Sequence, residues 1–168
     1  ISNSVECIED YSFCSCRGLT SVTIPNSVKS IGRSAFSSCR SLASVTIPNS
    51  VKSIGDQAFY GCNKLTSISI PNTVTSIGYY AFDGCDGLTH SIIVNDMFVY
   101  LPKNYVGHFS IPENISKIIG GAFEHCRGLT SVSIPNLMTS ICDNAFNGCS
   151  GLESVSISDF VTSIGNYA

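Results

Sequence analysis

Apolar residues recur along this chain with a period of 23 residues. The stretch that begins at Leu19 reads LTSVTIPNSVKSIGRSAFSSCRS, and the stretch from Leu42 repeats it almost unchanged. Each unit follows the pattern L-x-x-V-x-I-P-x-x-V-x-x-I-G-x-x-A-F-x-x-C-x-x, with serine or threonine at most of the early variable positions. Self-similarity at a short fixed period indicates a solenoid, in which stacked coils bury one continuous core.

The spacing inside one unit predicts its local structure. Val22 and Ile24 alternate with hydroxyl residues, as in a half-buried strand, and the proline that follows cannot donate a ladder hydrogen bond. The next two apolar positions turn inward again, and a glycine that recurs at residues 32, 55 and 78 predicts a backbone conformation that other residues resist. Ala35 and Phe36 would then enter the core from a short helical turn. The predicted fold class is an α/β solenoid: a right-handed array with a parallel strand ladder and short helical turns.

The leading apolar residues define the coils. Most coils have 23 residues, but the coil at residues 88–105 has 18 and lacks the A-F-x-x-C segment. Within it, Asn95 and Asp96 favour a turn, and residues 97–101 are predicted as a second strand. We predict one solenoid over residues 1–168, as a fragment of a longer array. Its parts are a partial coil 1–18, coils 19–41, 42–64 and 65–87, the short coil 88–105, coils 106–128 and 129–151, and a partial coil 152–168.

The chain has nine cysteines, and six of them occupy the same position of the repeat. A disulfide framework or a zinc site would show clustered pairs such as CxxC. One cysteine per coil predicts instead a column of buried, reduced thiols that pack as small apolar side chains. The column consists of Cys16, Cys39, Cys62, Cys85, Cys126 and Cys149, whereas Cys7, Cys14 and Cys142 lie outside it.

The motif IPNSVKSIG, followed by AF and a cysteine, resembles the BspA-like, or Treponema-type, leucine-rich repeat family over essentially the whole chain. The resemblance implies a leucine-rich-repeat solenoid with parallel strands along one face. It also implies a surface or secreted protein that displays repeats for adhesion to a host protein, the matrix or another cell. Ile119 and Cys142 depart from the family pattern because they occupy the glycine position, and Ser158 replaces the proline of the last unit.

Composition and charge exclude several function classes. Charged residues make up 12% of the chain, and the net charge is −3. No basic run suggests nucleic acid or an anionic membrane, and no apolar stretch approaches the length of a membrane span. No motif for a nucleophile, a phosphate-binding loop or a metalloprotease is present. We therefore predict no catalytic residues, no cofactor and no metal site.

The outward positions of the predicted ladder carry an uncharged stripe of hydroxyl groups that begins at Ser21 and Thr23. The stripe is interrupted by His90 and Ile92 in the short coil and by His108 in the next one. It is compatible with an ordinary solvated strand face or with a contact surface for a protein or a glycan. Ice binding is a third interpretation, which the serine bias and the irregular short coil disfavour.

His90 and His108 occupy the same position in consecutive coils, so their side chains are predicted to be neighbours about 5 Å apart. Two such imidazoles can respond to pH or contribute to a metal site, although two ligands alone make a weak one. Two exposed histidines with no special role are the simpler alternative.

The candidate binding surface is centred on the short coil, because identical coils offer identical surfaces and only this coil breaks the pattern. A second candidate lies at variable positions of the repeat, where exposed tyrosines often anchor partners. The candidate residues are His90, Ile92, Met97, Tyr100, Tyr105 and His108 for the first surface, and Tyr79 and Tyr80 for the second.

The family resemblance, together with the absence of catalytic motifs, implies a cell-surface or secreted repeat protein that mediates adhesion or protein–protein interaction. Its partner would be a protein or a glycan, such as a host or matrix component, and not a nucleic acid. The alternative is a structural spacer that displays another domain and has no binding site of its own.

Overall fold

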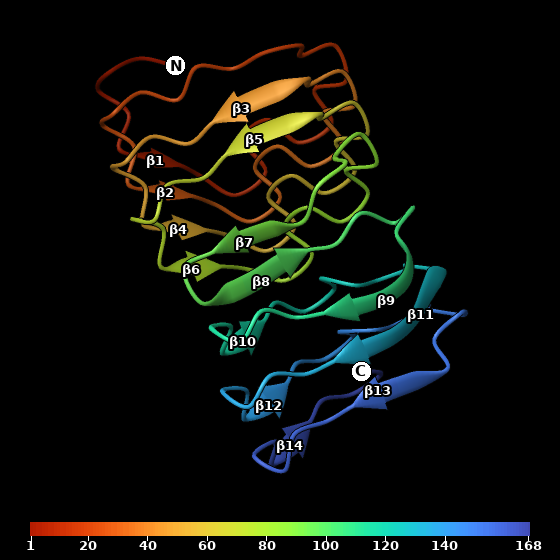
Figure 1. Cartoon of the computed structure of the whole chain (residues 1–168). Helices are drawn as coiled ribbons and strands as arrows, with labels where there is room; N and C mark the ends of the chain where they lie inside the picture. The colour runs from red at the N-terminus through yellow and green to blue at the C-terminus, as the bar shows by residue number, and fades with distance from the viewer. The chain divides into compact units, whose positions relative to one another are not determined.

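The computed structural model describes residues 1–168 and contains two compact units, Ile1–Thr89 and His90–Ala168. Both units are built from short strands and turns, and neither contains a helix (Figure 1). The protein is therefore a β-solenoid with coils of about 23 residues, as the sequence repeat predicted. The expected α/β class and the short helical turns are wrong.

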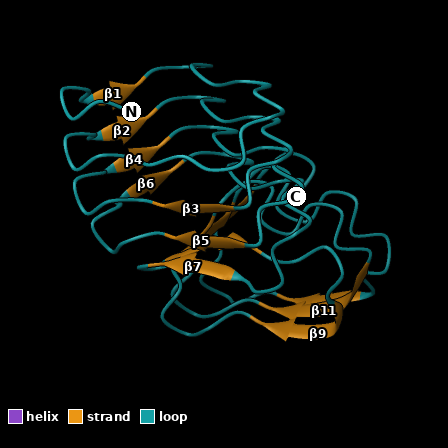
Figure 2. Ribbon diagram, turned by 90° about the horizontal axis from the view of Figure 1, so that it is seen from above, coloured by secondary structure: helices purple, strands orange, loops and turns teal.

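Two parallel ladders run through the first unit, on different sides of its coils (Figures 1 and 2). The register places each residue opposite its equivalent one repeat later, as in the pair Ile31 and Ile54. The ladder that follows the predicted strand positions contains β3 (Ser44–Thr46) and β5 (Ser67–Ser69), with Ser21 bridged to Ser44. The other ladder consists of β1 (Cys7–Ile8), β2 (Ser30–Ile31), β4 (Ser53–Ile54) and β6 (Ser76–Ile77).

The segment expected to be helical is a chain of turns held by the neighbouring coil. The Phe36 N–H donates to the Ala58 carbonyl of the next coil at 2.8 Å, whereas the Cys39 N–H donates back to the Phe36 carbonyl at 3.2 Å. Ser34 and Ser38 have φ of 51° and 59°, in the left-handed region. Every second N–H of this segment, at Ser34, Phe36 and Ser38, bonds to the next coil, and two of these residues are left-handed, so no continuous helical ladder can form.

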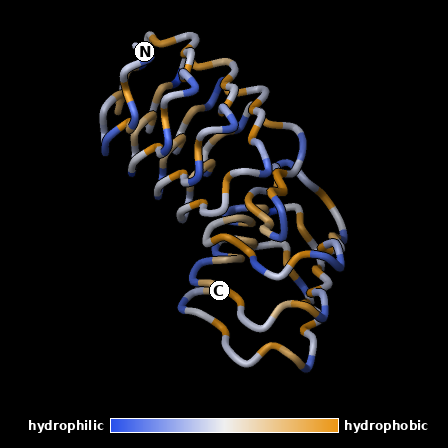
Figure 3. Tube along the Cα trace, turned by 90° about the vertical axis from the view of Figure 1, so that its left-hand side faces the viewer, coloured by the Kyte–Doolittle hydropathy of each residue, from blue (hydrophilic) through white to orange (hydrophobic).

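A column of stacked phenylalanine rings forms the core of the first unit. The centroids of Phe13, Phe36, Phe59 and Phe82 lie 5.2, 5.3 and 5.5 Å apart in succession, with nearly parallel planes. Apolar and polar segments recur at corresponding places in successive coils of this unit (Figure 3). The inward positions predicted from the repeat are thus confirmed.

The cysteine column lies beside the phenylalanines, and its thiols are hydrogen-bonded. The Cys39 Sγ donates to the Phe13 carbonyl at 3.1 Å, and the Cys62 Sγ donates to the Phe36 carbonyl at 3.2 Å. Burial raises the pKa of Cys39 to about 12. The repeat therefore uses cysteine both as a small apolar residue and as a weak donor to the preceding coil.

All nine cysteines are free thiols, and five members of the predicted column are buried. Cys16 is the exception, since its side chain is exposed. It lies on the first coil of the unit and so has a stacked neighbour on one side only. Its predicted burial was therefore wrong, and Cys14, two residues away, is exposed as well.

The repeated glycine is required by close packing and not by an unusual backbone conformation. A Cβ atom on Gly32 would lie 2.6 Å from the Asp10 backbone nitrogen, and one on Gly55 would lie 2.7 Å from the Arg33 nitrogen. The expectation based on backbone conformation was wrong. In the second unit Ile119 takes this position and is buried, where the preceding coil presents a strand in place of a turn.

The second unit begins with an antiparallel hairpin formed by the short coil. Strands β7 (Ile92–Val94) and β8 (Met97–Tyr100) are joined by a turn at which Asn95 has a φ of 56°. The predicted turn and second strand are confirmed. The remaining strands are β9 (Val106–Ser110), β10 (Lys117–Ile118), β11 (Gly128–Ser133), β12 (Ser140–Ile141), β13 (Ser154–Ser156) and β14 (Ser163–Ile164).

Pairing in the second unit follows the repeat only from β9 onward. The strand orders are β10–β8–β7, β13–β11–β9 and β12–β14, and every pair except β7–β8 is parallel. The hairpin supplies Phe98, which stacks on Phe123 with centroids 4.7 Å apart. A coil without the A-F-x-x-C segment thereby still contributes an aromatic ring to the core.

Candidate interaction surfaces

The outward strand positions of the first unit form an exposed hydroxyl surface. Parallel pairing places Ser44 opposite Ser67 and Thr46 opposite Ser69, and a single bridge places Ser21 opposite Ser44. All five side chains are exposed. Since side chains alternate across a strand, these hydroxyls point away from the core. The hydroxyl stripe predicted from the sequence is confirmed in this unit.

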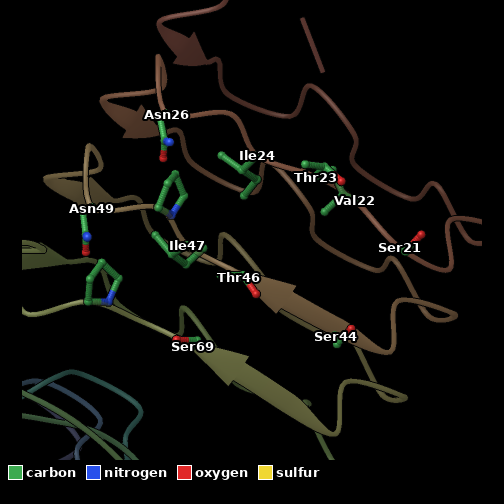
Figure 4. A pocket seen from close by; sticks show the side chains of 12 residues that line it. Ser21, Val22, Thr23, Ile24, Asn26, Ser44, Thr46, Ile47, Asn49 and Ser69 are labelled. Carbon is green, nitrogen blue, oxygen red and sulfur yellow. The ribbon is translucent and has the colours of Figure 1, made fainter. Parts of the chain in front are cut away.

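The hydroxyl surface continues into a groove of about 540 Å³ at the turns that follow the strands (Figure 4). The Asn26 and Asn49 side chains point the same way from consecutive turns, and no charged residue lines the groove (Figure 4). This role of asparagine was not predicted from the sequence, although the Pro-Asn pair recurs with the repeat. We call this site the hydroxyl groove; its polar side chains are Ser21, Thr23, Asn26, Ser44, Thr46, Asn49 and Ser69.

The polar side chains of the hydroxyl groove make no side-chain hydrogen bond to another group of the first unit. Their donors and acceptors are therefore solvated in the absence of a ligand. A ligand that matches them exchanges water for direct hydrogen bonds, each worth about 0.5–1.5 kcal/mol net. The site is suited to a neutral, hydrogen-bonding surface, such as a peptide backbone or a glycan.

The corresponding surface of the second unit is organised by His108. Its Nδ1 lies 2.8 Å from the Ser131 Oγ, and its Nε2 lies 2.9 Å from the Ser110 Oγ and 3.4 Å from the Ser133 Oγ. Both ring nitrogens thus have hydroxyl partners, on β9 and on β11. In the first unit the hydroxyl groups at the equivalent positions have no such partner, whereas in the second unit three of them are bonded to one imidazole.

The predicted pairing of two histidines is not found in the strand register. Register places Ser131, and not His90, opposite His108, because the short coil folds as a hairpin whose β7 pairs with β8. His90 is exposed. Among residues 1–168, no group of three or more His, Cys, Asp or Glu side chains is placed to hold a metal ion.

Two of the candidates in the short coil are core residues. Met97 and Tyr100 are 4% and 2% exposed, because all four residues of β8 lie inside the unit. They are removed from the candidate surface. Ile92 and Tyr105 are half-buried, and the Tyr105 hydroxyl donates to the His108 carbonyl at 2.6 Å.

The two tyrosines of the first unit, Tyr79 and Tyr80, lie in one turn and differ in exposure. Tyr79 is 45% exposed, and its backbone N–H donates to the Asp56 Oδ1 at 2.8 Å. Tyr80 is half-buried and adopts a φ of 57°. The expectation that at least one of the two is exposed is confirmed for Tyr79.

Comparison with protein families identifies the repeat. The family model described as BspA type leucine rich repeat region, with six copies, matches residues 1–106 and 95–168. The chain therefore belongs to the BspA-type leucine-rich repeat family, and no catalytic family is indicated. A search of curated proteins found no match. No helix in the chain has the length and apolar character needed to cross a membrane.

Several solved structures are similar to this chain. A leucine-rich repeat protein of T. pallidum is 29% identical with a TM-score of 0.62, over 96% of this chain and 67% of that one. A leucine-rich cell surface protein of Faecalibacterium prausnitzii is 26% identical with a TM-score of 0.58, over 95% and 60%. A leucine-rich repeat protein of Bacteroides ovatus is 26% identical with a TM-score of 0.51, over 100% and 56%. This chain thus spans about two thirds or less of their length.

Proposed function

We propose that this protein is displayed at the cell surface or secreted, and that it mediates adhesion by binding a protein or a glycan through the hydroxyl groove. The observation that carries the proposal is the array of unbonded hydroxyl and amide groups in the groove. Membership of the repeat family supports an interaction role, and the description of the F. prausnitzii neighbour as a cell surface protein supports the location.

The chemistry of the groove indicates what kind of partner it would bind. Hydroxyls repeat from coil to coil across the strands, in the direction of the ladder hydrogen bonds, with spacings of about 4.8 Å between neighbouring strands. No charge lines the site, so attraction would not depend on salt in the way that binding to a polyanion does. An extended ligand with regularly spaced neutral donors and acceptors fits this pattern.

The test introduces bulk and charge at two groove positions. The variant Ser44→Arg plus Thr46→Arg should lose binding of the labelled chain to surfaces coated with extracellular matrix proteins or glycans. The matched control is Ser154→Arg plus Ser156→Arg, which changes the equivalent exposed positions of β13. Equal binding by both variants would refute the groove as the site. Absence of binding by the parent chain to every coated surface would favour the structural spacer.

The exposed members of the sequence-based patches are two further candidate surfaces, one in each unit. His90 and Tyr79 are exposed, in the second and first unit respectively, and Ile92 is half-buried. If these residues contact the partner, His90→Ser plus His108→Ser or Tyr79→Ala should weaken binding and leave the circular dichroism spectrum unchanged. Full retention of binding in both variants would restrict the contact surface to the hydroxyl groove.

A further inference from the structure

Strand β9 has a sheet partner on one side only. In the strand order β13–β11–β9 it is the terminal strand, and its register partners all lie in β11. In the first unit, by contrast, Ser44 pairs with Ser21 of the preceding coil as well as with Ser67 of the next one. The coil before β9 contributes no strand to this edge, because its β7 pairs only with β8, and its β8 pairs with β7 and with β10.

Hydrogen-bond direction shows which groups this edge leaves open. The Ile111 N–H donates to the Ser133 carbonyl at 3.2 Å, toward β11. Successive residues of a strand direct their backbone groups to opposite sides, so the N–H and C=O groups of His108 and Ser110 face away from β11. One of these groups, the His108 carbonyl, accepts the Tyr105 hydroxyl at 2.6 Å. The two N–H groups and the Ser110 carbonyl form the open edge.

Side chains next to this edge provide an apolar contact. Val106 at the start of β9 is 77% exposed, which is unusual for an aliphatic residue in a strand. Phe109 is half-buried, and its ring meets the Tyr105 ring edge-on with centroids 5.3 Å apart. The Phe109 ring also packs on Phe98 and Phe123 in the core, so the exposed apolar side chain at this edge is Val106. A strand added here would find backbone partners at two residues and this exposed valine.

We infer that the open edge of β9 binds an extended peptide segment by β-strand addition, with alternating polar and apolar residues in that segment. The position is the one that the preceding strand occupies in a regular coil, where the chain itself supplies such a sequence. Two folded copies that met only through this short edge would bury far less than the roughly 1,000 Å² of a stable interface. A flexible peptide avoids that limit, and it does not require the hydroxyl groove.

The probe is the chain's own strand sequence, the acetylated peptide LTSVTIP of residues 19–25. Amide hydrogen exchange is measured residue by residue on the full chain by NMR. In the free chain, the amides of His108 and Ser110 should exchange at least about 100-fold faster than that of Phe109, which is bonded to β11. Saturation with the peptide should slow His108 and Ser110 and leave Phe109 unchanged.

Two controls separate backbone pairing from non-specific adsorption. The same peptide with N-methyl groups at alternate residues cannot complete the ladder and should not bind. The variant Tyr105→Phe keeps the ring and frees the His108 carbonyl, so peptide affinity should rise roughly threefold to tenfold. The variant Ser110→Pro removes an open donor at a position where an edge strand tolerates proline, and it should abolish binding.

Three results would overturn the inference. One is slow exchange at His108 and Ser110 in the free chain, which would mean that the edge is already paired. Another is equal binding of the methylated and unmethylated peptides. The third is protection of these two amides that appears with rising protein concentration and without peptide, since a second copy would then be the occupant. If Ser110→Pro does not fold, the methylated peptide still decides between the outcomes.

Discussion

The two units differ in what the outward strand positions of the repeat expose. In the first unit, Ser44 and Thr46 present hydroxyl groups that are exposed and unbonded, next to the asparagine turns. In the second unit, the equivalent positions of β9 are His108 and Ser110, and the imidazole is bonded to hydroxyls on both β9 and β11. The first unit thus offers a side-chain surface, whereas the second offers a backbone edge.

This difference shows how a repetitive chain acquires distinct sites. The core positions are nearly identical from coil to coil, because each ring and thiol must stack on its predecessor. Outward positions are free of that constraint, so one serine-to-histidine change or one shortened coil alters the surface without altering the core. Departures from the repeat are therefore the places where the two units differ in what they can bind.

The largest expected effect comes from the core that the units share. Phe59 is fully buried between two stacked rings, so Phe59→Ala should destabilise the chain by about 3–5 kcal/mol. The exposed Ser67 is the control, and Ser67→Ala should cost less than about 0.5 kcal/mol. Urea unfolding measures both. Similar losses at the two positions would contradict the inward and outward assignments.

Most of this core could be predicted from the sequence, because the period and the alternation of apolar residues determine which positions face inward. The turn at Ser34 and Ser38 could not, since serine gives no signal for left-handed backbone. The burial of Met97 followed from a hairpin that brings β8 into the core. The partner of His108 could have been predicted from the sequence, because a shift of 23 residues leads to Ser131. His90 lies in the short coil, which breaks this spacing.

Alkaline pH should weaken the shared core through its thiols. Burial raises the pKa of Cys39 to about 12 and that of Cys149 to about 11, from an ordinary value of 9.0. Above pH 9 the unfolded thiols lose protons that the folded thiols keep, so stability is full below that pH and falls as pH rises toward 11–12. The loss is on the order of 1 kcal/mol per pH unit for each thiol. Cys39→Ala should flatten the dependence; a pH-independent stability up to pH 11 would contradict the burial.

Thiol labelling tests the burial of each cysteine separately. In the native chain, Cys14 and Cys16 should react rapidly because they are exposed, and Cys39, Cys62 and Cys85 should react only after denaturant is added. Mass spectrometry of peptides after brief alkylation distinguishes them. Rapid native labelling of Cys62 would show that the coils of the first unit do not stack as described.

A smaller effect should come from the histidine that distinguishes the two surfaces. His108→Ser removes hydrogen bonds to Ser110 and Ser131 and should destabilise the second unit by about 1 kcal/mol. It would also convert this face into a copy of the first unit's hydroxyl surface. Urea unfolding measures the loss in the free energy of unfolding. Stronger binding to surfaces that the parent chain binds would show that the partner contacts exposed hydroxyl groups. An unchanged stability would mean that the imidazole bonds contribute nothing.

The most direct measurement is the amide exchange rate at one repeat position in the two units. Ser69 of β5 and Ser110 of β9 are equivalent, but Ser69 is paired with Thr46 of the preceding coil, whereas β9 pairs only with β11. Exchange at Ser110 should be at least about 100-fold faster than at Ser69, since only the latter N–H lies within a ladder. Equal rates would contradict the contrast between a closed ladder in the first unit and an open edge in the second.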